Sequence, residues 1–381
     1  MKTNLPFGHP AWVEIDLGQL KKNIAIIRQH IGKRLLCFPV KANAYGHGLI
    51  TISRAAVEAG VDYFAVSSLQ EGALLRKAGI TLPILVLGAI HEEQISGLLD
   101  YQLEFTIASR FKADLVAKKC CEFQKKCRVH VEVETGMQRT GVRPQTALDL
   151  LEYLHSQPIF EVVGLYSHLA TADIAGSDVA VKQIELFKNF VNQYYTKINP
   201  NHPVICHIAN SGGVCYFPES LMDMVRPGLL IFGYFPNPIQ ESFKKIAPFF
   251  SVKAKIAYFK VTAAQQGVSY GHTYITAKET RIVTVPVGYG DGLRRELSNR
   301  GHVLIRGRRY PIVGMICMDQ LMVDIGRDEA YVGDEVTLIG HQGNESITLN
   351  EVAQLCDTIP YEILCGFNDR LPRFYIEPTL G

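Results

Sequence analysis

The sequence feature that most constrains the fold is a series of eight short apolar segments, separated by stretches with helical periodicity. Each segment has the length and the apolar composition of a strand that is buried on both faces. The segments end, in chain order, at Lys41, Val66, Gly88, Ala108, Glu134, His168, Ile208 and Arg226. Consecutive ends are 18 to 40 residues apart, so helical connections fit between the strands. This alternation predicts an α/β fold built on a parallel sheet.

Two parallel architectures accommodate such a series. A (β/α)8 barrel has eight strands and typically about 250 residues. A doubly wound open sheet usually begins with a Gly-rich turn of the form G-x-G-x-x-G, and that turn is absent here. We therefore predict a (β/α)8 TIM barrel over residues 1–245, with the open sheet as the alternative.

The sequence changes character after about residue 245. Short strand-like segments are separated there by Gly and Asp turns, at 252–261, 281–288, 302–307, 310–315, 321–326 and 334–340. Only residues 348–356 have the pattern of a helix. We predict a mostly-β C-terminal domain over residues 246–381. A first alternating strand at about residues 11–16 is a candidate member of the same domain.

A helix is predicted directly after that first strand. Its apolar positions step by three and four residues, at Leu17, Leu20, Ile24, Ile27 and Ile31. This spacing places them on one helix face, and Gly32 ends the pattern.

Composition excludes several classes of protein. The 381 residues include 39 Lys and Arg against 37 Asp and Glu, so no overall charge favours nucleic acid or a membrane surface. The sequence contains no signal-peptide pattern and no run of 18 apolar residues. The nine cysteines include no C-x-x-C pair, which is typical of reduced thiols and excludes a zinc knuckle or a disulfide framework. We predict a cytoplasmic enzyme without a metal site.

Catalytic groups of a barrel gather at the C-terminal ends of its strands. Lys41 stands at such an end after an apolar run, so burial would disfavour its ammonium and make available the neutral amine that a Schiff-base lysine needs. From this strand alone, a lysine that simply reaches solvent is the more common interpretation. The same rim is predicted to carry Glu134, His168 and the turns at 210–213 and 226–228.

Two of these turns suit a phosphate group. Residues 211–213 are Ser-Gly-Gly and residues 226–229 are Arg-Pro-Gly-Leu, so unhindered backbone N–H groups lie beside a hydroxyl. Each turn alone is a weak signal, because most Gly turns are only turns. Together with Lys41 they indicate a phosphorylated aldehyde cofactor.

Nine ordered segments carry more specific information. They are V-K-A-N-A-Y-G-H-G (40–48), T-G-M-Q-R-T-G (135–141), S-H-L-A-T-A-D (167–173), A-N-S-G (209–212), R-P-G (226–228), S-Y-G-H-T-Y (269–274), G-Y-G-D-G (288–292), C-M-D-Q (317–320) and I-P-Y-E (359–362). In this order the chain resembles the alanine racemase family over nearly its whole length.

The resemblance implies an isomerase that interconverts L-alanine and D-alanine on a pyridoxal 5'-phosphate aldimine, and so supplies a peptidoglycan precursor. It also implies a homodimer in which each active site combines one barrel with the partner's β domain. A racemase of broader specificity, for serine, lysine or ornithine, is the alternative. A decarboxylase of the same plan is expected to have a carboxylate where this chain has Arg226, and a non-catalytic barrel would not need Tyr270.

The two acid–base groups follow from the same resemblance. Lys41 would hold the cofactor and act as one base, and Tyr270 of the partner subunit would be the other. A phenol, with a pKa of about 10, is a poor base unless its anion is stabilised. His168, also a cofactor neighbour, and Arg139 are the implied neighbours of this phenol. Arg226 would bond the pyridine nitrogen, which then stays largely unprotonated, so transamination is suppressed.

The remaining residues have binding or supporting roles in the resemblance. The cofactor phosphate would be bound by Tyr45, Ser211, Gly228, Leu229 and Tyr361. The substrate carboxylate would be held by Arg139 and by Met318 N–H. Tyr289 and Tyr361 would narrow the entrance, and Asp319 would order the adjacent loop. For these tyrosines, ordinary packing with a satisfied hydroxyl is the alternative.

One position departs from the family pattern. Glu132 stands where the family usually has a lysine, and that lysine often carries a carbamate that orients the arginine. A glutamate cannot form a carbamate, so we do not transfer the modification. A carboxylate inside the barrel needs a cationic partner, and we predict that Glu132 supplies negative charge near Arg139. Gln138 and Thr140 also replace the usual Gly and Leu beside the arginine.

Overall fold

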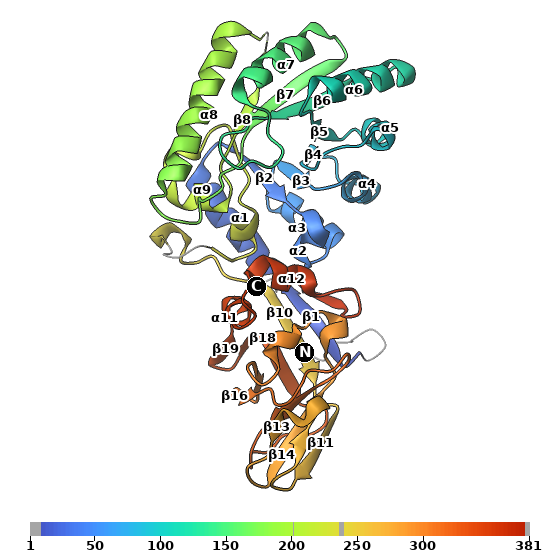
Figure 1. Cartoon of the computed structure of the whole chain (residues 1–381), viewed down its shortest axis with the longest axis vertical. Helices are drawn as coiled ribbons and strands as arrows, with labels where there is room; N and C mark the ends of the chain where they lie inside the picture. The colour runs from blue at the N-terminus through green and yellow to red at the C-terminus, as the bar shows by residue number, and fades with distance from the viewer. Residues whose placement is uncertain (1–8, 201, 236–239, 378–381) are drawn as a thin grey trace. The chain divides into compact units, whose positions relative to one another are not determined.

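The structure, a computed structural model of the chain, describes residues 9–200, 202–235 and 240–377 (Figure 1). The chain forms two units. The barrel unit comprises Gln19–Ala44 and Leu49–Pro248. The β unit comprises Met1–Gly18, Tyr45–Gly48 and Phe249–Gly381. The short segment Tyr45–Gly48 therefore belongs to the β unit, although residues of the barrel unit flank it in sequence.

The barrel unit is built on eight parallel strands. In sheet order they are β8 (Ile205–His207), β7 (Phe160–Tyr166), β6 (Cys127–Glu132), β5 (Glu104–Thr106), β4 (Ile84–Val86), β3 (Tyr63–Val66), β2 (Leu35–Pro39) and β9 (Met224–Val225). Backbone hydrogen bonds from Asp223 N–H to Cys206 C=O (3.0 Å) and from Arg226 N–H to Ala209 C=O (2.9 Å) join the two ends of the series. The sheet is closed, and the predicted (β/α)8 barrel is confirmed.

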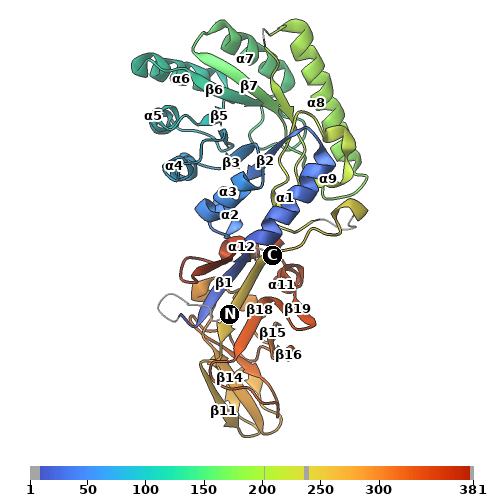
Figure 2. The same cartoon turned by 180° about the vertical axis from the view of Figure 1, so that it is seen from behind.

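Helices connect these strands and lie around the outside of them, as Figure 1 shows and Figure 2 shows from behind. They are α1 (Leu17–Ile31), α3 (Leu49–Glu58), α4 (Leu69–Lys77), α5 (Ile95–Asp100), α6 (Arg110–Phe123), α7 (Pro144–Ser156), α8 (Asp178–Lys197), α9 (Ser211–Tyr216) and α10 (Gly228–Ile231), with 3-10 turns η2 (Glu92–Gln94), η3 (Pro218–Ser220) and η4 (Glu241–Phe243). The segment labelled α2 (Lys41–Tyr45) has left-handed backbone at residues 42–44 and is a turn. The predicted apolar stripe of α1 is confirmed, since all five of its residues are buried. Each buried large aliphatic side chain contributes roughly 1.5–3 kcal/mol.

The interior of the barrel contains both apolar and polar layers. Side chains of β2, β3, β4 and β9 form an apolar cluster of Cys37, Tyr63, Ala65, Leu85 and Met224. Ionisable side chains are also buried there, namely Glu104, His130, Glu132 and His207 from strands β5, β6 and β8 and Arg226 directly after β9. Buried ionisable groups need partners, so their contacts are informative about the site.

The described residues of the β unit form three sheets. The largest has the order β16 (Arg308–Pro311), β15 (His302–Ile305), β18 (Glu335–Gln342), β10 (Phe250–Lys255), β1 (Ala11–Asp16) and β20 (Arg373–Ile376), with β19 (Glu345–Ile347) paired to β18. The second is β11 (Tyr258–Thr262), β14 (Thr280–Val285) and β17 (Leu321–Asp324), and the third is the pair β12 (Gly267–Val268) and β13 (Tyr274–Ile275). The turns η5 (Tyr270–His272), η6 (Tyr289–Asp291) and η7 (Arg295–Leu297) and the helices α11 (Leu349–Leu355) and α12 (Pro360–Gly366) complete it.

The first strand lies inside the largest sheet of the β unit. β1 pairs antiparallel with β10, where Val13 is opposite Val252, and parallel with β20, where Val13 is opposite Arg373. Strands β1 and β20, far apart in sequence, thus lie in one sheet together with β10. The mostly-β character predicted for the C-terminal region is confirmed.

Two sequence-based expectations in this unit were wrong. The segment 252–261 is not one strand but is divided between β10 and β11, which belong to different sheets. A second helix, α12, follows α11, although only one helix was predicted. α12 has seven residues, too few for a helical period to be distinct, and Pro360 occupies its first turn, where proline is tolerated.

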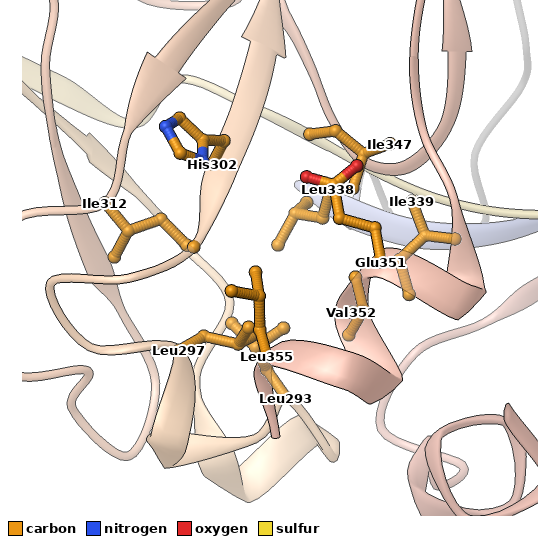
Figure 3. A pocket seen from close by; sticks show the side chains of 11 residues that line it. Leu293, Leu297, His302, Ile312, Leu338, Ile339, Ile347, Glu351, Val352 and Leu355 are labelled. Atoms are coloured by element: carbon orange, nitrogen blue, oxygen red, sulfur yellow. The ribbon is translucent and has the colours of Figure 1, made fainter. Parts of the chain in front are cut away.

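A small apolar cavity lies between helix α11 and the largest sheet of the β unit. Figure 3 shows side chains such as Leu297, Ile312, Leu338, Val352 and Leu355 pointing into it. Its volume is about 10 Å³, roughly what a single water molecule needs. The cavity is too small for a cofactor or an amino acid and is a packing feature of the core.

No helix within the three described ranges is long and apolar enough to cross a membrane. In the same ranges, no group of three or more His, Cys, Asp or Glu side chains is placed to hold a metal ion. All nine cysteines are free thiols. The cytoplasmic location and the lack of a metal stay predictions from the sequence.

Candidate active site

Lys41 begins a left-handed turn beyond the C-terminal end of β2. The φ angles of residues 42–45 are 53°, 54°, 52° and 51°, a region that residues other than glycine rarely occupy. This conformation costs roughly 1–2 kcal/mol per residue, so other contacts must stabilise it. Glu71 Oε1 accepts from Ala42 N–H (2.6 Å), and Asn43 Oδ1 accepts from Leu49 N–H (2.7 Å). Lys41 is therefore carried on a braced segment of backbone.

Arg226 lies on the same rim of the barrel as Lys41. Arg226 follows β9, which is the parallel neighbour of β2, and carboxyl ends of parallel strands meet at one rim. The side chain is only 4% exposed. Its Nη2 donates to Ser167 C=O (2.7 Å), its Nη1 donates to His207 Nδ1, and His168 Nδ1 lies 3.4 Å from Nη2. Burial lowers the pKa of Arg226, yet a guanidinium keeps its proton in proteins, so the rim contains a buried cation.

His168 follows β7 at this rim and is a neutral imidazole at physiological pH. Burial is the largest cause that lowers the pKa of His168, and together with the positive charges of Arg226, Arg139 and Lys41 it brings this pKa to about 3. Three cationic residues thus act on one side chain. Within the barrel unit, Lys41, Arg139 and Arg226 are therefore all close enough to His168 for their charges to affect its protonation.

Glu132 ends β6 with its side chain inside the barrel, 4% exposed. Its Oε1 lies 4.0 Å from Arg139 Nη2, which is the cationic partner that the sequence predicted. Its Oε2 accepts from Thr140 Oγ1 and from Tyr166 OH (3.3 Å). Thr140 is another position that departs from the family pattern, so the two unusual residues contact each other. Together they hold a carboxylate beside Arg139.

Three of the five residues predicted to bind phosphate lie together in the barrel unit. Ser211 begins α9, and its Oγ accepts from Leu230 N–H (3.1 Å) in α10, the helix that begins with Gly228 and Leu229. Gly228 N–H donates to Arg226 C=O (2.9 Å). A Cβ at Gly212 would lie 2.1 Å from Ala172 C=O, so only glycine fits beside Ser211.

The other two, Tyr45 and Tyr361, lie together in the β unit. Their ring centroids are 5.7 Å apart. Burial, together with Tyr361, raises the pKa of Tyr45, so its hydroxyl keeps its proton and can donate. Tyr361 belongs to α12, whose Leu364 C=O would lie 2.4 Å from a Cβ at Gly46. The unpredicted helix α12 therefore packs directly on the segment that follows the lysine turn.

Tyr270 is the most exposed of the predicted site residues, with 72% of its surface accessible. It begins η5 between β12 and β13 and stands between two residues with left-handed backbone, Ser269 (φ 64°) and Gly271 (φ 69°). Ser269 Oγ donates to Met315 C=O (2.6 Å), which ties the turn to the neighbouring loop. The phenol is thus presented outward on a constrained turn.

Tyr289 and Met318 belong to two loops of the β unit that pack on each other. Tyr289 N–H donates to Cys317 C=O (3.1 Å), and Gly290 N–H donates to Met318 C=O (2.8 Å). A Cβ at Gly288 would lie 2.2 Å from Met318 C=O, so this approach requires glycine. Both Tyr289 (44%) and Met318 (53%) are exposed. These two loops present a common surface.

The types of side chain that the two units present, each taken by itself, suit a phosphorylated pyridine aldehyde. The barrel unit supplies an amine at Lys41, a buried guanidinium at Arg226 and a hydroxyl at Ser211, and the β unit supplies the phenols of Tyr45 and Tyr361. Such a molecule needs an amine for its aldehyde, a donor for its ring nitrogen and several donors for its phosphate. Each requirement is matched by a residue type in this set.

Comparison with known proteins identifies the family. The sequence model of the alanine racemase N-terminal domain matches residues 15–236, and that of the C-terminal domain matches residues 249–375. An alanine racemase of Symbiobacterium thermophilum is 41% identical over 367 residues, covering 96% of this chain and 97% of that protein. One of Nostoc sp. is 40% identical over 372 residues, covering 96% of each. The crystal structure of alanine racemase from Bacillus anthracis with bound L-Ala-P has a TM-score of 0.92, with 34% identity and 98% and 97% of the chains covered.

The chain belongs to the alanine racemase family. The predicted family, the predicted fold and the predicted class of enzyme, an amino-acid racemase, are therefore confirmed. The roles assigned to single residues stay predictions.

Two residues that support the candidate site of this alanine racemase family member were not predicted from the sequence. Glu71 accepts from Ala42 N–H and also from Ser67 N–H (2.8 Å) and Ser67 Oγ (2.9 Å). In the sequence, Ser68 and Glu71 have only the spacing of a helix cap, and Ser68 Oγ does accept from Glu71 N–H (3.3 Å). The carboxylate instead reaches the lysine turn, which no local pattern indicates.

The second missed residue is Arg370, which joins the loops of Tyr289 and Met318. Its Nη2 donates to Asp319 (2.6 Å), and its Nε lies 3.2 Å from Asp291 Oδ1. Asp291 in turn accepts from Gly288 N–H (2.9 Å). Asp319 was predicted to order its loop; the ion pair with Arg370 is a contact through which it could do so, and the role stays a prediction. Arg370 is distant in sequence from Asp291 and Asp319, so no local sequence pattern indicates these contacts.

The neutral state of His168 predicts a loss of stability in acid. Because its pKa is lowered from 6.5 to about 3, the unfolded chain binds a proton in this range that the folded chain does not bind. The free energy of unfolding should therefore fall as the pH decreases below about 6.5. Between pH 7 and pH 4.5, His168→Gln should lose about 2–3 kcal/mol less than the unmodified chain, at 1.36 kcal/mol per pKa unit. Urea unfolding at both pH values measures this.

The exposed His341 offers the control. His341→Gln should lose as much stability on acidification as the unmodified chain. An equal loss in His168→Gln and in the unmodified chain would show that His168 takes up its proton without opposing folding.

Proposed function

We propose that this chain interconverts L-alanine and D-alanine with pyridoxal 5'-phosphate as cofactor, using Lys41 and Tyr270 as two opposed bases. The observation that carries the proposal is the position of Lys41 and Arg226 at the ends of two neighbouring parallel strands. A reactive amine and a buried guanidinium on one rim match the aldehyde and the ring nitrogen of that cofactor. When bound, the cofactor withdraws electrons from the substrate's α-carbon and so makes its proton removable.

The residues that would hold the cofactor come from both units. Lys41 would bind the aldehyde covalently, and Arg226 would donate to the ring nitrogen without transferring its proton. Ser211, Gly228, Leu229, Tyr45 and Tyr361 would donate to the phosphate. A ring nitrogen that stays unprotonated is a weaker electron acceptor, which favours return of the proton to the α-carbon over transamination.

Inversion at the α-carbon requires one base on each side. Lys41 Nζ would exchange the proton on the D-alanine side, and the phenol of Tyr270 would exchange it on the L-alanine side. His168 is neutral, so it can assist the phenol through a hydrogen bond but not through charge. Arg139 is then the cation that would stabilise the phenolate and hold the substrate carboxylate, together with Met318 N–H.

A homodimer with shared sites would bring the two bases together. Tyr270, Tyr289 and Met318 are exposed on the β unit, and Lys41 lies in the barrel unit. Large exposed aromatic and apolar side chains are typical of residues that a partner covers. Tyr289 and Tyr361 would narrow the entrance and favour the small side chain of alanine over serine, lysine or ornithine.

Borohydride reduction tests the lysine assignment. In the cofactor-loaded protein, reduction followed by peptide mass analysis should place the pyridoxyl group on Lys41. A chiral product assay with alanine, serine, lysine and ornithine, with and without added cofactor, should show racemisation of alanine foremost. Label on another lysine, or no cofactor-dependent product, would contradict the proposal.

Complementation tests the shared site. Lys41→Ala and Tyr270→Phe should each be nearly inactive, and mixing them should restore activity. In a hybrid dimer one of the two sites contains both intact residues. Failure to recover activity, when subunit exchange is shown by mass spectrometry, would mean that each site is built from one chain.

A further inference from the structure

Four buried ionisable side chains form a line through the interior of the barrel. Glu104 Oε2 lies 2.9 Å from His130 Nε2, His130 Nδ1 lies 3.2 Å from His207 Nε2, and His207 Nδ1 contacts Arg226 Nη1. Their exposed fractions are 3%, 0%, 0% and 4%. Glu104 is the first residue of β5, and Arg226 follows the last residue of β9. The line thus connects the N-terminal end of a strand to the rim that carries Lys41.

The barrel is shaped to hold the two imidazoles. His130 is opposite Gly164 in the parallel pair β6 and β7. A Cβ at Gly164 would lie 2.3 Å from His130 Nδ1, so any larger residue would displace this ring from His207. The ring of Tyr166 stacks on His207 with centroids 5.0 Å apart and planes 6° from parallel. Both rings are therefore fixed in position.

The hydrogen-bond partners determine where each proton lies. Arginine can only donate, so His207 Nδ1 must accept from Arg226. A neutral His207 then carries its proton on Nε2 and donates it to His130 Nδ1. His130 in turn carries its proton on Nε2 and donates it to Glu104. If His130 had a proton on both nitrogens, its Nδ1 would donate to His207 Nε2, and His207 would then have no proton on either nitrogen. Hydrogen bonds are therefore donated in one direction, from Arg226 toward Glu104, and each imidazole has a single proton.

Glu104 is the anionic end of this line. It accepts from His130, from Tyr63 OH and from Arg128 Nε (2.7 Å). These three donors stabilise the anion of Glu104 against the cost of its burial. A buried carboxylate and a buried guanidinium are thus joined through two neutral rings.

We propose that Glu104 is a positioning residue for Arg226 and acts on it through His130 and His207. The inference rests on the proposed function, in which Arg226 donates to the ring nitrogen of the cofactor. The carboxylate polarises His130, which polarises His207, and His207 Nδ1 becomes a stronger acceptor for Arg226. With Nη1 committed to His207 and Nη2 to Ser167, the plane of the guanidinium is fixed.

A double-mutant cycle on the cofactor-loaded enzyme tests this coupling. Glu104→Gln keeps the shape of the side chain and removes its charge. The ratio kcat/KM for alanine racemisation is expected to fall about tenfold, the difference between a charge-assisted and a neutral hydrogen bond. In an Arg226→Lys background the same substitution should change kcat/KM by less than about twofold, because the group on which Glu104 acts is gone.

The chain offers two matched controls. Tyr63→Phe and Arg128→Gln each remove another hydrogen-bond donor from the same carboxylate but leave the line to Arg226 intact. Both should change kcat/KM by less than about threefold, whatever they do to the melting temperature. A loss as large as that of Glu104→Gln would mean that the carboxylate only stabilises the barrel.

Nitrogen NMR of histidine-labelled, cofactor-loaded enzyme gives a measurement that does not depend on activity. His130 and His207 should each show a bare Nδ1 and a protonated Nε2. In Glu104→Gln, the Nδ1 signal of His207 should move, whereas Tyr63→Phe should leave it in place.

Two results would overturn the inference. One is a protonated Nδ1 on His207, and the other is an equal effect of Glu104→Gln with and without Arg226. Failure of the proposed function would be separate: the unmodified protein would not racemise alanine, or Arg226→Lys alone would leave kcat/KM unchanged.

Discussion

Replacing Tyr270 by phenylalanine is expected to abolish exchange of the α-proton of L-alanine with solvent while leaving alanine binding nearly intact. A positioned acid–base group contributes about 10²–10⁴-fold to a rate, and the substitution removes only the phenolic oxygen. Lys41 would remain to serve the D-alanine side. Exchange of the α-proton of D-alanine into deuterated water should therefore persist at a much higher rate than exchange from L-alanine. Nuclear magnetic resonance of each enantiomer measures both rates.

A second tyrosine of the β unit provides the control for this experiment. Tyr258 is 58% exposed in β11, and Tyr258→Phe should leave both exchange rates unchanged. Equal residual exchange from the two enantiomers in Tyr270→Phe would count against separate bases on opposite sides. Loss of binding without loss of exchange would assign Tyr270 to substrate recognition.

Glu132→Gln is expected to weaken substrate binding or turnover by roughly ten- to a hundredfold. A hydrogen bond or ion pair to a charged group contributes about 1.5–3 kcal/mol, and each 1.4 kcal/mol is tenfold. The 4.0 Å separation from Arg139, whose side chain is 49% exposed, favours the lower end of this range. The substitution removes the negative charge that, in the proposed function, would hold the guanidinium of Arg139 toward the substrate carboxylate. Steady-state kinetics with alanine measure the effect.

Two further variants separate the charge from its surroundings. Thr140→Val removes the hydroxyl that donates to Glu132 and should have a smaller effect, because the carboxylate keeps its charge. Glu161→Gln changes a carboxylate that is 59% exposed and pairs with Arg128, and it should leave the kinetics unchanged. Unchanged kinetics of Glu132→Gln with a lowered melting temperature would leave Glu132 only a role in stability.

The sequence by itself determined the strands of the barrel and the residues at their ends. A parallel strand buried on both faces must be a short apolar run, so the runs that end near Lys41, His168 and Arg226 are visible without a structure. The stripe of α1 was predictable for the same reason, since helical period and burial coincide there. Motif spacing also indicated the family, because the nine segments occur in order along the chain.

Only the tertiary structure decided which of these residues are partners. The left-handed turn after Lys41 needs Glu71, the loop of Met318 needs Arg370, and Glu132 pairs with Thr140 and Arg139. The direction of the protons between Glu104 and Arg226 depends on four strands that are distant in sequence. Local periodicity indicates whether a side chain faces the interior, but it does not indicate which side chains it contacts there. That is set by the closure of the barrel and by the register of its strands, which bring together residues up to 122 positions apart in this line.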